Sequence, residues 1–293
     1  MINGMKIDLH MHSNVSDGTD TPPELLEKVR QSGIRLFALT DHDGIRGCGI
    51  IRDSLREGDP AFLCGAEFSC RDEEGKYHIL GYNFDPAGAS ILNVLETGHG
   101  LRMKKAAARL EYLESAFGFT FSREDRETLL SLDNPGKPHI GNLMVKYGYA
   151  DSKDQAIHEY MNCVRFPDAY IRPEQAIRGI LESGGIPVLA HPAFGSGEEL
   201  ITDQALENRV RRLKGMGLRG VEAFYSGFTP KLRAGVLALA EKYDLLVTAG
   251  SDYHGRNKLV EMGDTELSEA DGLPEGLRKF LEETGQADLI KKE

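Results

Sequence analysis

The chain has 293 residues, of which 40% are apolar and 28% charged, a balance typical of a globular protein with one or two domains. No window approaches the roughly 18 apolar residues that cross a membrane, and no secretory signal is visible. We therefore expect a cytoplasmic protein with no membrane partner and no evident obligate protein partner. The net charge of −11 argues against binding of long nucleic acids. A small phosphorylated substrate remains compatible with this charge if metal ions supply local positive charge.

The first part of the chain alternates short β-rich runs with amphipathic helical stretches. A strand is predicted at 6–12, followed by a helix that Thr21 caps and Gly33 ends. Further strands are predicted at 34–40, 61–67 and 76–82. This alternation is typical of parallel strands joined by crossover helices. The glycines in this part have neither P-loop nor dinucleotide-binding order, so we interpret them as turn residues: Gly44, Gly47 and Gly49.

The alternation stops between 91 and 172, where the clearest predicted elements are helices. These helices lie at 101–117, 123–130 and 155–161. Strands resume at 185–190, 218–223 and 245–250, with helices at 203–215 and 230–243, giving about seven strands. We predict an α/β domain formed by 1–90 and 173–293, interrupted by an inserted helical substrate-binding subdomain at 91–172.

Histidines and carboxylates recur where these predicted strands end. His10 and His12 lie two apart on one strand, so their rings project from the same face. Such a pair is a weak signal alone. The signal is stronger here because parallel strands bring their ends, and the histidines and carboxylates found there, to one rim of a barrel. Nitrogen and oxygen donors without thiolates suit Mn²⁺, Zn²⁺ or Fe²⁺. Two such ions can clamp a phosphoryl oxygen and activate water, which predicts phosphoester hydrolysis. The candidate ligands are His10, His12, Asp17, His42, Glu67, His78, His191, Asp252 and His254.

Seven motifs in series carry a resemblance that covers nearly the whole chain. They are Asp8-Leu9-His10-Met11-His12-Ser13, Ser16-Asp17-Gly18, Thr40-Asp41-His42-Asp43, Gly65-Ala66-Glu67, His78-Ile79-Leu80-Gly81, Ala190-His191-Pro192 and Gly250-Ser251-Asp252-Tyr253-His254-Gly255. Together they resemble the polymerase and histidinol phosphatase (PHP) family of metal-dependent phosphoesterases. The resemblance implies a distorted (β/α)7 barrel, like that of amidohydrolases, with two or three divalent metal ions.

The resemblance also implies roles for single residues. One ion would be held by His10, His12, Glu67 and Asp252, and a second by Asp17, His42 and His191. Glu67 would bridge ions, His78 and His254 would complete the cluster, and Asp8 and Asp43 would orient the histidines. Catalytic roles are implied for Asp17, His191 and His254.

The chain resembles most the stand-alone family members whose helical insertion carries a basic-Pro-His stretch. Those members are nucleotide phosphatases, cyclic-phosphate hydrolases and short-RNA exonucleases. Substrate binding is therefore expected at Lys137, His139 and Arg172, with Arg102 and Lys105 as weaker candidates. The chain departs from relatives at Lys137, which replaces an arginine and loses its bidentate fork. It also departs at Phe228, which replaces a histidine.

The predicted function is hydrolysis of phosphate esters by metal-bound hydroxide. The expected substrates are small nucleotide-like or sugar phosphates: nucleoside mono- or bisphosphates, cyclic phosphates or the 5′ end of a short oligonucleotide. Two alternatives stay open. The chain could be a histidinol-phosphate phosphatase, because that activity uses the same ligands, or a catalytically silent regulatory barrel.

Overall fold

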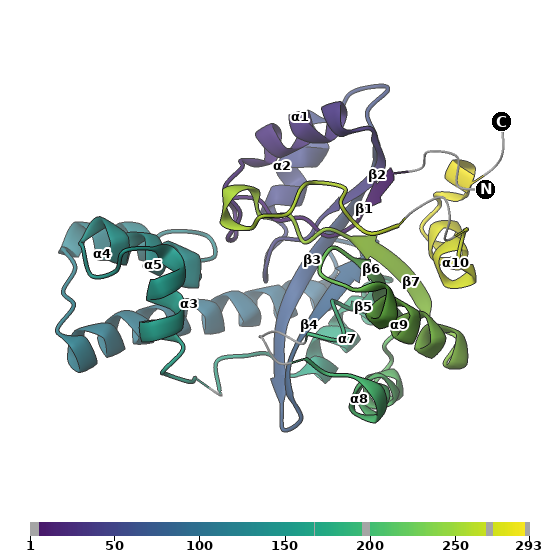
Figure 1. Ribbon diagram of the computed structural model, residues 1–293. Helices are drawn as coiled ribbons and strands as arrows, with labels where there is room; N and C mark the ends of the chain where they lie inside the picture. The colour runs from purple at the N-terminus through teal and green to yellow at the C-terminus, as the bar shows by residue number, and fades with distance from the viewer. Residues whose placement is uncertain (1–5, 167, 195–199, 268–271, 291–293) are drawn as a thin grey trace.

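A computed structural model describes residues 6–166, 168–194, 200–267 and 272–290. Seven strands form one sheet and follow each other in chain order across it (Figure 1). The strands are β1 (Lys6–Asp8), β2 (Ile34–Leu39), β3 (Ala61–Asp72), β4 (Gly75–Tyr82), β5 (Ile186–Leu189), β6 (Gly220–Tyr225) and β7 (Leu246–Gly250).

Helices fill most connections between these strands. In the described part of the chain, none of them is both long and apolar enough to cross a membrane. The helical segments are α1 (Pro22–Ser32), α2 (Arg46–Ser54), α3 (Ala89–Phe117), α4 (Arg123–Leu130), α5 (Lys137–Lys146), α6 (Lys153–Gln155), the π-helix η1 (Ala156–Met161), α7 (Pro173–Glu182), α8 (Asp203–Gly215), α9 (Pro230–Lys242), the 3₁₀ turns η2 (Gly255–Asn257) and η4 (Ala287–Ile290), and α10 (Glu275–Glu283).

The first and last strands meet and close the sheet. The backbone N–H of Leu9 donates to the carbonyl of Ala249 at 2.8 Å, and that of His12 donates to the carbonyl of Tyr253 at 2.8 Å. Backbone pairing therefore continues from β7 back to β1, and the predicted seven-stranded α/β barrel is confirmed. The closure also brings the segment after β1 beside the segment after β7.

The prediction of parallel strands is wrong for β4. This strand pairs antiparallel with both β3 and β5, whereas the other neighbours pair in parallel. Only Glu73 and Glu74 separate β3 from β4, and a parallel crossover needs a dozen residues or more. The sequence signal for β3 also ended too early, because the strand continues to Asp72.

Several helices differ from their predicted positions. Helix α3 begins at Ala89 rather than near 101, and α2, α5, α7 and α10 had not been predicted. Two of the glycines interpreted as turn residues, Gly47 and Gly49, lie in α2. A Cβ at Gly47 would lie 2.4 Å from the Oδ2 of Asp41. This glycine therefore permits close packing of α2 and does not form a turn.

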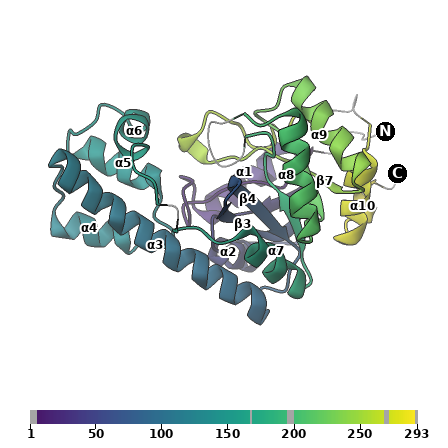
Figure 2. The same ribbon diagram turned by 90° about the horizontal axis from the view of Figure 1, so that it is seen from below.

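Two hydrophobic cores are joined by α3. Ile91, Val94 and Leu95, near its start, belong to the barrel core. Leu110 and Leu113, near its end, belong to a separate core with α4, α5 and η1. Figures 1 and 2 show these helices standing to one side of the barrel, with α3 reaching back along it.

Candidate metal centre and its surroundings

The structure brings all nine predicted ligands together around one cavity of about 230 Å³. Seven of them line it, and His10 and His12 lie fully buried beneath, each with an Nε2 atom 3.5 Å from the Oδ1 of Asp252. The cavity is lined by Asp17, His42, Glu67, His78, His191, Phe194, Tyr225, Asp252, His254 and Lys258.

Glu67 lies at the centre of the cluster. Its Oε2 is 3.3 Å from the Nε2 of His10 and 3.1 Å from the Nε2 of His12. Its Oε1 is 2.7 Å from the Nδ1 of His78. The two oxygens thus face different imidazoles, which suits a carboxylate that bridges two ions.

The donor atoms fall into three groups in which all ligand atoms lie within 4.8 Å of one another. One group contains the four residues expected around the first ion. Another joins Asp17 and His42 to His12 and His254, without His191. The Nε2 of His191 instead lies 3.3 Å from both the Oε1 of Glu67 and the Nδ1 of His78. The groups are His10–His12–Glu67–Asp252, His12–Asp17–His42–His254 and His42–Glu67–His78.

Hydrogen bonds set the tautomer of two of these imidazoles. The Nδ1 of His10 lies 2.9 Å from a carboxylate oxygen of Glu222, and the Nδ1 of His254 lies 2.8 Å from the carbonyl of Asp252. Both partners accept hydrogen bonds, so in the neutral rings the hydrogen resides on Nδ1. The Nε2 lone pairs then face the cluster, as metal ligation requires.

Electrostatics in the cluster favour ionised carboxylates but act differently on two imidazoles. Burial would lower the pKa of His10, but Glu222, Glu67 and Asp252 raise it well above its usual value. Burial, together with the neighbouring His254, lowers the pKa of His12 to about 4. Burial alone would raise the pKa of Asp17, but His42 and His254 hold it well below its usual range. Burial opposes ionisation of Glu67 as well, yet the surrounding histidines lower its pKa. A neutral His12 and ionised Asp17 and Glu67 are the protonation states that bind a divalent cation, and His10 would release its proton on binding.

Several buried donor atoms have no hydrogen-bond partner within the described residues. They include the Nε2 atoms of His10 and His12, the Oδ1 of Asp17, the Nδ1 of His42 and the Nδ1 of His191. Buried polar atoms are normally paired, so such a concentration needs an explanation. Divalent cations fit this donor set, because they would coordinate these atoms.

Three neighbouring carboxylates have structural partners. Asp8 accepts from the backbone N–H and hydroxyl of Ser251, which holds the segment after β7. Asp41 accepts from the hydroxyls of Ser13 and Ser16. The expectation that Asp43 orients a histidine ring is wrong, because its carboxylate contacts Arg102 instead. Asp8 reaches the backbone N–H of His10 but not its ring.

The backbone is constrained at two candidate ligands. His191 and Asp252 have φ angles of 26° and 59°, in a region that residues with side chains seldom adopt. The N–H of His191 donates to Glu222 at 2.8 Å, and that of Asp252 donates to the carbonyl of His10 at 2.8 Å. These bonds hold both side chains toward the cavity despite the unfavourable conformation.

Sequence reasoning missed three residues at the site: Glu222, Tyr225 and Lys258. Glu222 is fully buried in β6, and an acidic residue inside an apolar strand was the available signal. Tyr225 donates its hydroxyl to the Oδ2 of Asp252 at 3.2 Å. Lys258 contacts the same oxygen, although nothing in its local sequence distinguishes it from a surface lysine.

The three predicted substrate-binding residues lie in different environments. His139 is half-buried, and burial lowers its pKa while the nearby Asp17 opposes that shift. Lys137 contacts the side chain of Asn162 at 2.5 Å. Arg172 forms a bidentate pair with Glu73, at 2.9 Å for each bond, on the exposed β3–β4 turn. Arg172 is therefore engaged with a carboxylate, unlike His139.

A row of buried basic side chains extends from the site along α3. Arg102 pairs with Asp43, next to His42. Lys105 lies one turn further, with its Nζ 3.8 Å from the centroid of the Tyr170 ring, and Arg109 follows. Burial lowers the pKa of Lys105 to about 6. Of the described residues that these side chains contact, Asp43 is the one carboxylate, so the two guanidinium groups carry more positive charge than their contacts balance.

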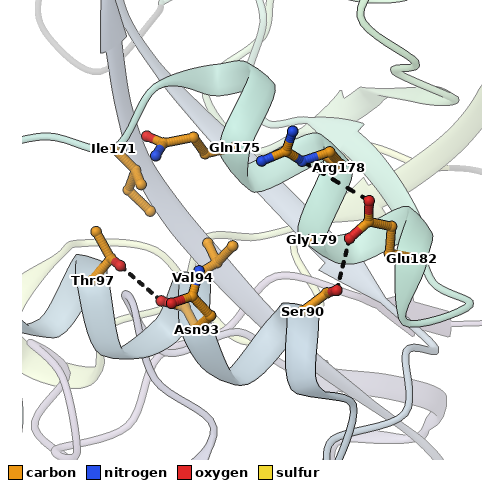
Figure 3. Close-up of a pocket in the computed structure, with 9 residues that line it drawn as sticks. All are labelled: Ser90, Asn93, Val94, Thr97, Ile171, Gln175, Arg178, Gly179 and Glu182. Atoms are coloured by element: carbon orange, nitrogen blue, oxygen red, sulfur yellow. Dashed lines mark hydrogen bonds and ion pairs between the residues drawn. The ribbon is translucent and has the colours of Figure 1, made fainter.

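Another cavity, of about 70 Å³, lies between α3 and α7, outside the cluster (Figure 3). Its polar groups bind each other: Ser90 donates to Glu182 at 2.7 Å, and Arg178 pairs with the same residue at 3.9 Å. A Cβ at Gly179 would lie 2.5 Å from the Cγ2 of Val94. The cavity is thus a gap beside a close helix contact and contains no candidate ligand.

The comparisons with known proteins agree with this fold and site. The PHP domain family profile matches residues 8–171. A 5′-3′ exoribonuclease of Haemophilus influenzae is 28% identical and covers 88% of this chain and 93% of its own length. A phosphoribosyl 1,2-cyclic phosphate 1,2-diphosphodiesterase of Eggerthella lenta is 30% identical and covers 85% of this chain and 94% of its own length. A 3′,5′-nucleoside bisphosphate phosphatase of Chromobacterium violaceum is 26% identical, over 92% of each chain.

Among solved structures, one from Bifidobacterium adolescentis superposes with a TM-score of 0.80 at 25% identity, covering 95% of this chain and 96% of its own. It is thought to be a metal-dependent phosphoesterase. The fold and the donor cluster are those of a metal-dependent hydrolase of phosphate esters. The chain belongs to the PHP family, and the prediction of a phosphoesterase is confirmed.

Proposed function

We propose that the protein hydrolyses phosphate esters of small ribose-containing compounds and that its cluster holds two or three divalent ions. The carrying observation is the convergence of six imidazoles and three carboxylates on one cavity. Mn²⁺, Zn²⁺ and Fe²⁺ all suit such donors. Ions bound there would activate water and neutralise charge on the phosphoryl group. Asp17, His191 and His254 line the cavity and are the proposed catalytic contacts.

His139 is proposed to donate a proton or a hydrogen bond to the substrate. The backbone N–H of Gly136 donates to its Nδ1 at 3.0 Å, so the hydrogen of the neutral ring resides on Nε2. A neutral ring is expected at pH 7, because burial lowers the pKa. Its Nε2–H would then be available to donate to a leaving oxygen or a phosphate oxygen.

The substrate class rests on two observations. The relatives are named for a ribonucleic acid, a phosphoribosyl cyclic phosphate and a nucleoside bisphosphate. In addition, the buried row Arg102–Lys105–Arg109 begins beside the cluster and suits a second phosphate. Histidinol phosphate has one phosphate and a cationic amine, so this row would not favour it. Lys137 and Arg172 are proposed to contact the substrate only after exchanging their present partners.

The division into a barrel (1–90 and 173–293) and a substrate-binding insertion (91–172) is part of the proposal. The separate hydrophobic core of α4, α5 and η1 supports it. The side chain of Lys153 in α6 also donates to the carbonyl of Asn257 at 3.0 Å, in the segment that follows His254. Exclusion of long nucleic acids and a cytoplasmic location remain predictions.

Phosphate release from a panel of substrates tests the proposal. The panel contains a nucleoside monophosphate, a 3′,5′-bisphosphate, a 1,2-cyclic phosphoribose, a short 5′-phosphorylated oligoribonucleotide and histidinol phosphate, each with Mn²⁺. We expect turnover of one or more ribose phosphates, lost in His12→Ala and retained in the matched variant of an exposed histidine, His99→Ala. Turnover of histidinol phosphate alone would establish the alternative substrate. Release from no compound would favour the silent-barrel alternative.

A further inference from the structure

Lys258 lies at the metal cavity in a position fixed by the segment that follows β7. It comes directly after η2 and lines the same cavity as the candidate ligands. Its neighbour Asn257 donates its side-chain amide to the carbonyl of Asp17 at 2.7 Å. The segment is therefore tied to the ligand loop after β1, and this sets where the Lys258 side chain begins.

The two oxygens of Asp252 face different partners. Oδ1 lies 3.5 Å from the Nε2 atoms of His10 and His12, on the side where an ion would be held. Oδ2 contacts the ammonium of Lys258 and the hydroxyl of Tyr225. Metal binding through Oδ1 therefore does not require Lys258 to leave. Its ammonium would remain beside the ion.

The ammonium also has capacity for a further ligand. It carries three donors, and Asp252 is the one carboxylate it contacts within the described residues. The side chain is 39% exposed, so it is open to the cavity. Among the described residues lining that cavity, Lys258 is the one lysine or arginine.

Charge balance indicates which substrate this arrangement suits. Three carboxylates line the cavity, namely Asp17, Glu67 and Asp252. While the bound water is neutral, two divalent ions would exceed their charge by one positive unit, and Lys258 adds another. A phosphomonoester dianion would balance this surplus, whereas a phosphodiester carries only one negative charge.

We propose that Lys258 is a phosphate-binding residue, which contacts a non-bridging oxygen of the substrate and favours phosphomonoester dianions over phosphodiesters. This inference rests on the proposed function. It assigns to one side chain the choice between two classes of phosphate ester. Tyr225 supports it by sharing Oδ2 of Asp252 and thereby fixing the carboxylate that Lys258 contacts.

The test compares Lys258→Met and Lys258→Arg with Arg256→Met, which removes the same charge from an exposed position two residues away. Calorimetry first measures Mn²⁺ stoichiometry and affinity. Binding of inorganic phosphate to the Mn²⁺-loaded protein is then measured without any turnover. In Lys258→Met we expect full Mn²⁺ stoichiometry and phosphate affinity weakened ~10-fold or more, with partial recovery in Lys258→Arg and no change in Arg256→Met.

Steady-state kinetics on a matched monoester and diester then test selectivity. Lys258→Met should lower kcat/KM for the monoester more than for the diester. Unchanged phosphate affinity together with full Mn²⁺ loading would overturn the proposal, because Lys258 would then only neutralise Asp252. Phosphate binding remains measurable if the wild type turns over no ester, so failure of the proposed function is distinguishable from failure of this inference.

Discussion

Glu222 supports His10 from behind, with one carboxylate oxygen 2.9 Å from the Nδ1 of the ring. Its second oxygen accepts the backbone N–H of His191 at 2.8 Å. One buried carboxylate thereby fixes two candidate ligands that lie far apart in the sequence. Such outer partners set the tautomer and orientation of metal-binding histidines.

We expect Glu222→Gln to weaken Mn²⁺ binding ~10–100-fold, because an amide orients His10 without stabilising its basic ring. Glu222→Ala should weaken Mn²⁺ binding further, since the backbone N–H of His191 also loses its acceptor. Calorimetric titration with Mn²⁺ measures both effects. Glu207→Gln is a change of the same kind at a partly exposed position of α8, far from the cavity in sequence, and it weakens a pair with Lys242. This variant serves as the control. Equal affinities in all these proteins would contradict the role of Glu222.

Removal of a candidate ligand should have a larger effect than removal of its partner. His12 belongs to two of the three donor groups. His12→Ala should therefore lower the number of bound ions, and it should lower activity by more than the ~10–100-fold typical of a lost outer partner. Metal content by elemental analysis and phosphate release measure the two effects. Full metal content in His12→Ala would contradict its assignment as a ligand.

Lys105→Met is expected to stabilise the protein while weakening binding of a second phosphate. The native pKa of Lys105 is lowered from 10.5 to about 6 by burial, so a buried cation is costly at pH 7. We expect the free energy of unfolding to rise by ~1–3 kcal/mol near pH 7. Denaturant unfolding and the KM for a 3′,5′-bisphosphate are the two measurements.

The pH dependence of this gain has a defined sign. Between pH 6 and 10.5 the unfolded chain holds the Lys105 proton more tightly than the native protein does, so wild-type stability rises with pH across this window. The methionine variant lacks this contribution. Its advantage should be largest at pH 6 or below and should disappear toward pH 10.5. An advantage that grows with pH would contradict the lowered pKa.

Two glycines test the contact between α3 and α7. Gly179→Ala would place a Cβ 2.5 Å from Val94 and should cost ~1–3 kcal/mol by overpacking. Gly100 also lies in α3, and a Cβ added there would meet no atom within 4 Å. Gly100→Ala should therefore stabilise the protein by ~0.5–1 kcal/mol. Thermal unfolding of both variants measures these changes in stability. We expect the Mn²⁺ affinity to be unchanged in both.

The parts of the fold that depend on local signals were predictable. Thr21 and Glu24 form the capping box of α1, and Gly33 ends it with a φ of 76°. Helices α4 and α8 have the predicted bounds. The direction of β4 was not predictable from periodicity, because an alternating pattern is the same for parallel and antiparallel strands. The antiparallel direction of β4 is set by the short turn that joins it to β3.

The site divides in the same way. Motif residues at strand ends were predictable, since a barrel brings those ends together. Glu222 depends on a long-range contact with His10, which no local pattern encodes. Lys258 lies only six residues after Asp252, but their contact depends on the turn η2 between them. Arg172 looked like a substrate contact beside a proline, but its partner Glu73 lies 99 residues earlier in the chain. Pairings at such separations depend on the folded structure.

Helix α3 runs without interruption for 29 residues from the barrel core to the core of the helical region. A continuous helix has no hinge, and its two ends are each held by buried side chains. The helical region is therefore held in one position beside the barrel before any substrate arrives. If this region contacts the substrate, it would do so as a rigid surface, and catalysis would not have to wait for a lid to close.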